Sequence, residues 1–169
     1  MMIADSDPIL AFGDFLEEFS GRLEIVLDIK SSDIEREILE SISQKYLDMI
    51  IFSSFNSRTI ARIKALNRLT RTALIVGPMR NMGMGLSRVK YLGNKLAKLG
   101  CEAIHLSYRS AGKKLVKNLE AAGFGISVWT VDDEHSAHRF VELGVNGIFT
   151  NVAEKLVQFF HAHPNAVHH

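Results

Sequence analysis

Short apolar runs alternate about six times with longer amphipathic stretches, and this rhythm constrains the fold more than any other feature. The strand-like runs are residues 23–30, 48–53, 72–77, 103–107, 126–131 and 147–150. A stretch with helical spacing of apolar residues follows each run. Strands joined by helices in this order pair in parallel, as in an α/β barrel or a doubly wound sheet. No linker-like segment divides the chain, so we predict one domain over residues 1–160.

The helix ends carry recognisable signals. Ser32 with Glu35 three residues later forms a capping-box pattern, which predicts a helix starting at Ser32. Asn56 is suited to cap the helix after the second strand-like run, and Asp132 or Asp133 the helix after the fifth. Glycines at positions suited to end helices are Gly21, Gly100, Gly123 and Gly144. These signals fix the order of the elements along the chain.

The first strand-like run differs from the next two. Residues 23–30 alternate with period two, so Glu24, Val26, Asp28 and Lys30 share one face while the intervening apolar residues share the other. Residues 48–53 and 72–77 are almost entirely apolar, which is typical of strands covered on both faces. The first run is therefore expected to form a strand with one apolar face and one largely polar face.

Composition excludes several classes of protein. Apolar residues make up 47% and charged residues 23% of the 169 residues, which argues against a disordered chain. No apolar run approaches the roughly 18 residues of a membrane span. Asp5 and Asp7 stand where a signal peptide would carry Lys or Arg, and the single Cys101 allows no internal disulfide. We therefore expect a cytoplasmic protein without a membrane span.

The charges are unevenly distributed although the net charge is only +1. Residues 61–125 hold 13 basic and 2 acidic side chains, whereas residues 1–60 hold 5 basic and 12 acidic ones. A basic middle third could face phosphates, an anionic membrane surface or nucleic acid. The alternative is that these side chains cover the outer faces of amphipathic helices. No nucleic-acid-binding motif is present, so we predict no nucleic-acid partner.

Ligands of parallel α/β folds bind at the carboxyl ends of the strands, which gives a list of candidate residues. Asp28 and Lys30 end the first run on one face, two residues apart. This pair could hold a divalent cation and a phosphate oxygen, and the alternative is a local ion pair. The other candidate strand ends are Ser53, Ser54, Phe55, Gly77, His105, Ser107, Trp129, Asp132, Thr150 and Asn151.

Common catalytic signatures are absent from the sequence: it has no G-x-S-x-G elbow, Walker loop or G-x-G-x-x-G motif. His135 and His138 are three apart on one predicted helix, but no partner stands at zinc-site spacing, which favours a solvated helix. Cys101 with His105 is a poor nucleophile–base pair, since Cys101 lies at the amino end of its strand. The Met-rich segment 78–85 predicts a loop, and we assign residues 161–169 to a His-rich tail without a function.

Four sequence blocks resemble the C-terminal part of the glycerophosphodiester phosphodiesterase family. They are FLEEFSGRLEIVLDIK at 15–30, IFSSF at 51–55, VWTVDD at 128–133 and GVNGIFTN at 144–151. The order of the blocks is that of the family, and together they extend over about residues 10–155. The resemblance implies a partial (β/α)8-type TIM barrel containing about the last five or six βα units.

The resemblance also implies an activity, the metal-dependent hydrolysis of glycerophosphodiesters to glycerol 3-phosphate and an alcohol. Asp28 stands where the family has a glutamate metal ligand, and Lys30 matches a lysine that faces the phosphate. Phe55 and Trp129 match aromatic residues of the substrate cleft, while Asn151 replaces a final aspartate. The implied cofactor is Mg²⁺ or Ca²⁺, provided that the site is completed, and the implied ligand is a glycerophosphodiester or a phosphate.

The family motifs that supply two acid–base histidines and a Glu-x-Asp pair of metal ligands have no match in this sequence. We therefore expect the chain alone to be inactive. An incomplete barrel has open edges, and three explanations remain open: a piece of a longer enzyme, pairing with a second copy or a complementary barrel half, or rearrangement into an open sheet. The alternative functions are a non-catalytic barrel remnant that binds phosphate or a partner, and an unrelated α/β binding protein.

Overall fold

The structure is a computed structural model that describes residues 11–19, 21–79 and 86–163. Within these ranges the strands form one parallel sheet with the order β1-β2-β3-β4-β5-β6. The strands are β1 (Ile25–Asp28), β2 (Ile50–Ser54), β3 (Arg71–Val76), β4 (Ala103–Ser107), β5 (Gly125–Trp129) and β6 (Gly147–Ile148). The helices are α1 (Phe12–Phe19), α2 (Glu35–Ser41), the 3-10 helix η1 (Gln44–Met49), α3 (Ser57–Leu66), α4 (Leu86–Leu99), α5 (Lys113–Ala121), α6 (Glu134–Glu142) and α7 (Ala153–Ala162).

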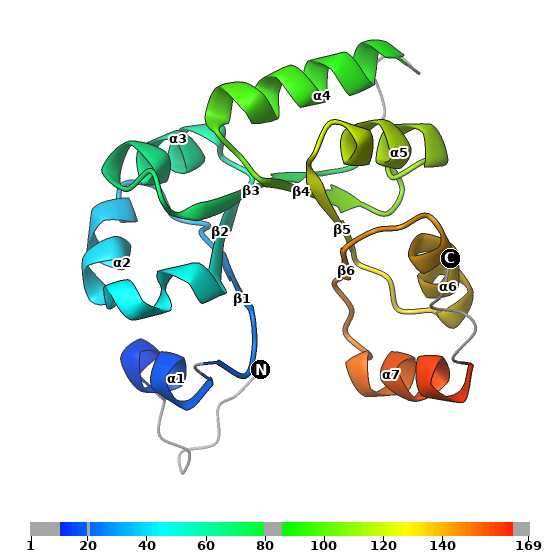
Figure 1. Ribbon diagram of the computed structural model, residues 1–169, viewed down its shortest axis with the longest axis horizontal. Coiled ribbons are helices and arrows are strands. Elements are labelled where there is room, and N and C mark those ends of the chain that lie inside the picture. Colours follow the sequence, from blue (N-terminus) through cyan, green and yellow to red (C-terminus); the bar gives the residue numbers. More distant parts are fainter. Residues whose placement is uncertain (1–10, 20, 80–85, 164–169) are drawn as a thin grey trace.

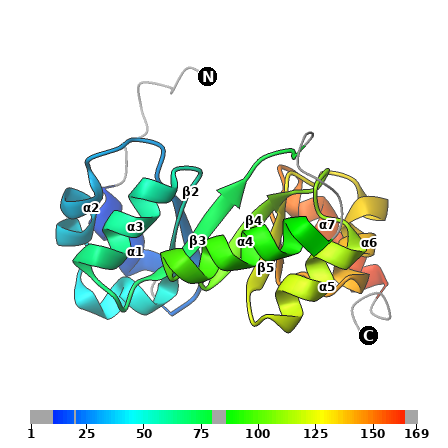
Figure 2. The same cartoon turned by 90° about the horizontal axis from the view of Figure 1, so that it is seen from above.

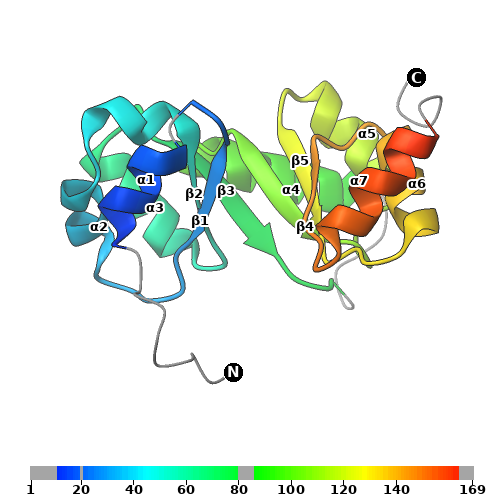
Figure 3. The ribbon, with the colours of Figure 1, turned by 90° about the horizontal axis from the view of Figure 1, so that it is seen from below.

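The sheet curves into an arch with the strands on the inside and helices α2 to α6 on the outside (Figure 1). Strands β1 and β6 stand at the two ends of the sheet order, and the arch is open between them. The view from below looks into this opening, with α1 and α7 on its two sides (Figure 3). The sequence prediction of a partial (β/α)8-type barrel is therefore confirmed, as a half-barrel.

Side chains alternate between the inside of the arch and its helix-covered outside. In β4, Ile104 and Leu106 are completely buried under the helices, while His105 between them faces the interior hollow of the arch. The alternation predicted for residues 23–30 also holds, since Ile29 is buried against α1 while Val26 and Asp28 face inward. A period of two along each strand is the physical reason for both observations.

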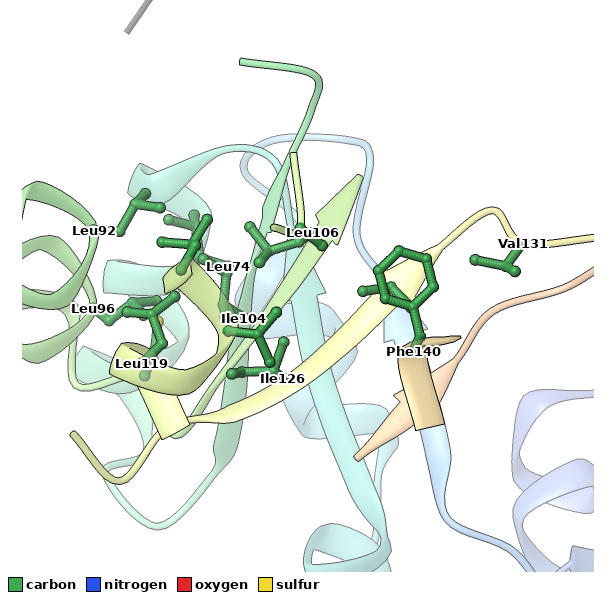
Figure 4. Packing of buried hydrophobic residues seen from close by; sticks show 14 of the residues in the cluster. Leu74, Leu92, Leu96, Ile104, Leu106, Leu119, Ile126, Val131 and Phe140 are labelled. Carbon is green, nitrogen blue, oxygen red and sulfur yellow. The ribbon is translucent and has the colours of Figure 1, made fainter. Parts of the chain in front are cut away.

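Two apolar clusters hold the helices on the outer face of the sheet. The larger joins the outward side chains of β3, β4 and β5 to helices α4 to α7 and includes Leu74, Leu106 and Phe140 (Figure 4). The smaller packs α1, α2 and η1 on β1 and β2 around the fully buried Phe52. Helix α3 contributes Ile60 to the larger cluster and Ile63 to the smaller one. The core therefore lies between sheet and helices, and the inner face of the arch remains free for a site.

Two of the predicted helix caps are present. The Asn56 side chain accepts a hydrogen bond from the Arg58 backbone N–H at 2.9 Å, and Asp133 accepts one from the Ser136 N–H at 2.8 Å. Both satisfy amide groups that the first helical turn leaves without a partner. The choice between Asp132 and Asp133 is thereby settled in favour of Asp133.

The capping box predicted at Ser32 is wrong. Helix α2 begins at Glu35, which is buried, and its N-cap residue Ile34 makes no side-chain cap bond. The Ser32 hydroxyl instead accepts a hydrogen bond from the Asn56 side-chain amide at 3.3 Å. Asp33 has a positive φ of 68°, which turns the backbone before the helix starts. Tertiary contacts with the β2–α3 turn therefore override the local capping pattern.

Other boundaries differ by a few residues. Strand β1 is shorter than the predicted run, and Leu23 is 55% exposed. Helix α7 continues to Ala162, and most of the His-rich tail lies outside the described residues, as does most of the predicted 78–85 loop. The proposed division into a domain of residues 1–160 and a tail of residues 161–169 stays a prediction. No helix in the described ranges has the length and apolar character to cross a membrane.

Candidate functional site

A cavity of about 420 Å³ lies at the carboxyl ends of the strands, on the inner face of the arch. This is the end at which parallel α/β barrels place their active sites. The volume is within the range of small-molecule sites. The lining residues are Val26, Asp28, Lys30, Ser53, Phe55, Ile75, His105, Trp129 and Phe149. The four residues singled out from the sequence, Asp28, Lys30, Phe55 and Trp129, are thus brought together.

Strand β1 supplies the charged side of this cavity. Asp28 and Lys30 both point to the inner face because they are two residues apart in an extended segment. The Lys30 ammonium lies 3.8 Å from the Asp28 carboxylate, with the two side chains 80% and 35% exposed. The local ion pair that the spacing allowed is therefore present. Such an exposed pair contributes little stability, which leaves both groups free to exchange partners with a ligand.

Aromatic side chains form the opposite wall. The rings of Phe55 and Trp129 meet edge to face, with centroids 5.6 Å apart. The Trp129 indole N–H donates a hydrogen bond to the backbone carbonyl of His105 at 3.0 Å. This bond satisfies the only polar atom of the indole and fixes the ring plane. The wall is therefore oriented before any ligand arrives.

Serine hydroxyls in β2 join the loops that carry Lys30 and Phe55. The Ser54 hydroxyl donates to the Ile29 carbonyl at 2.7 Å and accepts from the Asn56 backbone N–H at 3.1 Å. Ile29 directly precedes Lys30, and Phe55 lies between Ser54 and Asn56 in the sequence. A single buried hydroxyl therefore sets the separation between the ammonium and the first aromatic ring.

His105 lies at the middle of the inner face. It is 2% exposed, and its ring packs edge-on against Phe149 with centroids 4.8 Å apart. Burial lowers the pKa of this imidazole to about 4, because desolvation penalises the charged form. His105 is consequently neutral at pH 7 and cannot serve there as a cationic partner for a phosphate.

Asp132 joins the last two loops at the mouth of the arch. One carboxylate oxygen accepts hydrogen bonds from the Asn151 backbone N–H at 2.8 Å and from the Thr150 hydroxyl at 3.0 Å. The other accepts from the Asn151 side-chain amide at 2.9 Å. These bonds, the Asn151 backbone first, lower the pKa of Asp132. Asn151, which the resemblance noted only as a substitution, thus holds the β6–α7 loop to the β5–α6 loop.

This contact makes the stability of the chain dependent on pH at acidic values. A carboxyl group whose pKa is lower in the folded state than in the unfolded state stabilises the fold at pH values above its ordinary pKa. That stability is lost as the pH falls through the pKa of the folded state. We expect Asp132→Asn to lower Tm at neutral pH, with the difference from the wild type shrinking between about pH 5 and pH 2. Glu18→Gln, an exposed change on α1, is the control and should show no such convergence. A gap that is constant across this range would contradict the assignment.

The described residues do not fit a complete divalent-metal centre. No group of three or more His, Cys, Asp and Glu side chains that could hold a metal ion occurs among them. Asp28 is the only carboxylate that lines the cavity, and the Lys30 ammonium competes for it. Ca²⁺ requires six to eight oxygen ligands, and Mg²⁺ is usually held by one or two carboxylates together with substrate phosphates and waters. Asp28 could therefore supply one ligand, and the others must have a different origin.

A second hollow of about 320 Å³ lies at the amino ends of the strands and is a weaker candidate. Its charged groups already have partners: the Arg71 guanidinium contacts the Glu24 carboxylate at 2.6 Å, and Lys64 pairs with Glu102. The Asn146 side-chain oxygen accepts from the Ile126 N–H at 2.7 Å. The Asn146 bond joins the segment before β6 to β5, the Arg71–Glu24 pair joins β3 to the residue before β1, and the Lys64–Glu102 pair joins α3 to the residue before β4. We therefore interpret this end as structural.

Two lining residues, Phe149 and Ile75, were not among the candidates from the sequence, and only Phe149 had a signal there. Phe149 shares a face with Gly147 and Asn151 by period two, so the last run already placed it on the inner side. Ile75 is in an almost wholly apolar run, where no polar alternation distinguishes the two faces. Only the curvature of the sheet shows which of its side chains reach the cavity.

Comparison with known proteins connects this geometry to a family. The sequence model described as "Glycerophosphoryl diester phosphodiesterase family" matches residues 19–155. A Bacillus subtilis (strain 168) protein named "Putative glycerophosphodiester phosphodiesterase YhdW" is 24% identical over 149 residues, which cover 85% of this chain and 58% of that protein. The chain therefore spans less than two thirds of the length of this relative.

Solved structures share the fold. A glycerophosphodiester phosphodiesterase from Parabacteroides distasonis ATCC 8503 aligns with a TM-score of 0.70 and 18% identity, covering 89% of this chain and 63% of that one. An Oleispira antarctica phosphodiesterase in complex with the product sn-glycerol-3-phosphate aligns with a TM-score of 0.65 and 22% identity, covering 78% and 53%. In both, the matched part is a little more than half of the longer chain.

Proposed function

The chain belongs to the glycerophosphoryl diester phosphodiesterase family, and we propose that it supplies the substrate-binding wall of a glycerophosphodiester phosphodiesterase site. One observation carries this proposal: Asp28, Lys30, Phe55 and Trp129 line a single cavity at the carboxyl ends of the parallel strands. They come from β1, the β2–α3 turn and β5, which only the folded arch brings together.

Each side of the cavity suits a different part of the substrate. The exposed Lys30 ammonium is a mobile point charge of the kind that binds a phosphate group. The Phe55 and Trp129 rings offer an apolar surface to the carbon atoms of a glycerol unit. Binding of a phosphate by Lys30 would replace its weak contact with Asp28, leaving that carboxylate to a cation. The arrangement is compatible with a small phosphorylated polyol.

Trp129 allows this proposal to be tested directly, because it is the only tryptophan of the chain. We expect sn-glycerol 3-phosphate to change the intrinsic fluorescence in a saturable manner. Lys30→Ala should weaken binding about tenfold, the loss expected for one charge-assisted contact at an exposed site. A fluorescence titration of both proteins measures the two dissociation constants.

Lys155→Ala is the matched control, since Lys155 is an exposed lysine on α7 paired with Glu134. It should bind as the wild type does. Equal affinities for the wild type and Lys30→Ala would remove the phosphate-binding assignment. Free glycerol at the same concentration should leave the emission unchanged, which separates phosphate recognition from a solvent effect.

Catalysis is a separate question, and the described residues speak against turnover by this chain alone. Among the described residues, His105 is the only histidine that lines the cavity, and it is buried with a pKa of about 4. Proton transfer to a leaving alcohol needs a group whose pKa lies near the working pH. We propose that the proton-transferring groups and the remaining metal ligands belong to a complementary part of the barrel, on another chain or in sequence outside residues 1–169.

The number of strands favours a partner that supplies a small missing part of the barrel over a second copy of this chain. An eight-stranded barrel has an interior just wide enough for side chains to fill, and the described sheet has six strands. Two further strands would join the free edges of β1 and β6. Two copies of this sheet would give twelve strands and a wide lumen. We therefore propose a partner that contributes two βα units, and we place a closed homodimer second.

A non-catalytic role in phosphate binding is the second candidate function. The one histidine among the described lining residues, His105, has a pKa of about 4, which favours this role for the isolated chain. The two candidates share the ligand chemistry and differ in turnover once a complement is present. Measuring turnover with and without a complement therefore distinguishes the two candidates.

A further inference from the structure

The outer surface over α4 and α5 has a composition that the cavity does not explain. Residues 49–101 contain ten Lys or Arg and no Asp or Glu. Helices α3, α4 and α5 lie side by side on the outer face of the sheet (Figure 2). The helices that carry seven of these ten residues, α3 and α4, therefore lie in one layer outside the sheet, on the side opposite to the inner cavity.

Five lysines give this layer its charge, and we call them the basic face: Lys90, Lys95 and Lys98 on α4, and Lys113 and Lys114 on α5. None of their ammonium groups forms an ion pair or hydrogen bond within the described part of the chain. All except Lys95, which is half-buried, are exposed. Their charges are therefore not neutralised by the protein itself.

Lysines elsewhere in the chain behave differently. Lys64 pairs with Glu102, Lys117 with Glu120 and Lys155 with Glu134. Glu102 and Glu120 are the only acidic residues between positions 49 and 131, and each is already engaged by a lysine outside the basic face. The acidic residues of this region therefore do not neutralise the lysines of the basic face. An ordinary solvated helix surface has charges of both signs interspersed.

Tyr91 adds an apolar element to the basic face. It stands between Lys90 and Lys95 on α4 and is 51% exposed. A tyrosine with an exposed ring is suited to the interface between water and lipid, where its ring can be buried and its hydroxyl stays hydrated. The lysine side chains can extend past such a ring toward charged headgroups. A surface for single-stranded nucleic acid would instead combine positive charge with several stacking aromatics, and Tyr91 is the only aromatic residue in α4 and α5.

We propose that the basic face docks the protein on the surface of a membrane that contains anionic phospholipids. Attraction of several lysines to a negative surface, together with shallow burial of Tyr91, supplies the affinity. The cavity inside the arch takes no part in this contact. The inference therefore goes beyond the proposed function and stands or falls independently of it.

Sedimentation with vesicles tests the docking surface. We expect the wild-type chain to bind vesicles of phosphatidylcholine mixed two to one with phosphatidylglycerol, and not vesicles of phosphatidylcholine alone. High salt should release it, because screening shortens the range of the attraction. Each lysine near an anionic surface contributes about a fivefold change in partitioning. The double variant Lys90→Glu/Lys98→Glu should thus bind at least about 25-fold more weakly.

Lys45→Glu/Lys155→Glu is the charge-matched control, since it changes the net charge equally on α7 and η1. It should keep most of the vesicle binding. Equal loss in both double variants would mean that net charge alone matters and would overturn the basic face as a docking site. Failure of the wild type to bind the phosphatidylglycerol vesicles would overturn it outright, as would binding to a labelled single-stranded oligonucleotide with no binding to vesicles.

Discussion

The purified chain, supplied with Mg²⁺ or Ca²⁺, is expected to hydrolyse glycerophosphocholine at a negligible rate. Loss of one proton-transferring group costs about 10²–10⁴-fold in rate. Among the described residues that line the cavity, the one histidine, His105, is buried with a pKa of about 4. The rate should therefore lie at least about 10⁴-fold below that of a full-length relative assayed in parallel. Release of glycerol 3-phosphate, followed by a coupled enzymatic assay, measures both rates.

The informative control is a complementation experiment. The first part of a full-length relative, containing the strands that have no counterpart here, is added to the chain. Recovery of hydrolysis that requires Asp28 and Lys30 would favour the split-enzyme proposal over the phosphate-binding remnant. Saturable binding of glycerol 3-phosphate without recovered hydrolysis would favour the remnant. Rapid turnover by the chain alone would contradict both.

Leu106→Ala is expected to destabilise the chain by about 3–5 kcal/mol. Leu106 lies in β4 at the centre of the sheet, is completely buried and belongs to the larger apolar cluster (Figure 4). Truncation of a buried leucine removes its transfer free energy and leaves a cavity that packed neighbours fill only in part. Urea unfolding followed by circular dichroism gives the free energy of unfolding for variant and wild type.

Leu69→Ala is the matched control, because it removes the same atoms from a side chain that is 77% exposed. It should change the free energy of unfolding by less than about 0.5 kcal/mol. A comparable loss in both variants would mean that burial against the sheet is not what stabilises the half-barrel. A small effect of Leu106→Ala alone would indicate that the outer clusters tolerate a cavity, as loosely packed cores do.

Much of the fold was readable from the sequence. Period-two alternation in residues 23–30 put Val26, Asp28 and Lys30 on one face of the first strand, and the structure has all three lining the cavity. The caps at Asn56 and Asp133 were predicted from local hydrogen-bond chemistry and are present. Such features depend on residues that lie close together along the chain, and these can be read directly from the sequence.

The wrong capping prediction at Ser32 and the missed contact between Asp132 and Asn151 have a common cause. The capping pattern at Ser32 is locally sound, but Ser32 bonds to Asn56, which is 24 positions away. The contact of Asp132 with Asn151 joins two loops that are adjacent only because β5 and β6 pair. Local rules cannot weigh such contacts, since the partner is known only when the sheet has formed.

The amino-acid sequence alone determined the strand–helix rhythm, the shared face of Asp28 and Lys30, the uneven charge and the family resemblance, because each depends on residue types at fixed spacing. The tertiary structure decided that Phe55 and Trp129 meet 5.6 Å apart and that His105 is buried at the middle of the inner face. It also decided that five lysines of the outer layer have no acidic partner among the described residues. Curvature of the sheet and pairing between distant strands set these distances, and neither is encoded by any short stretch of the chain.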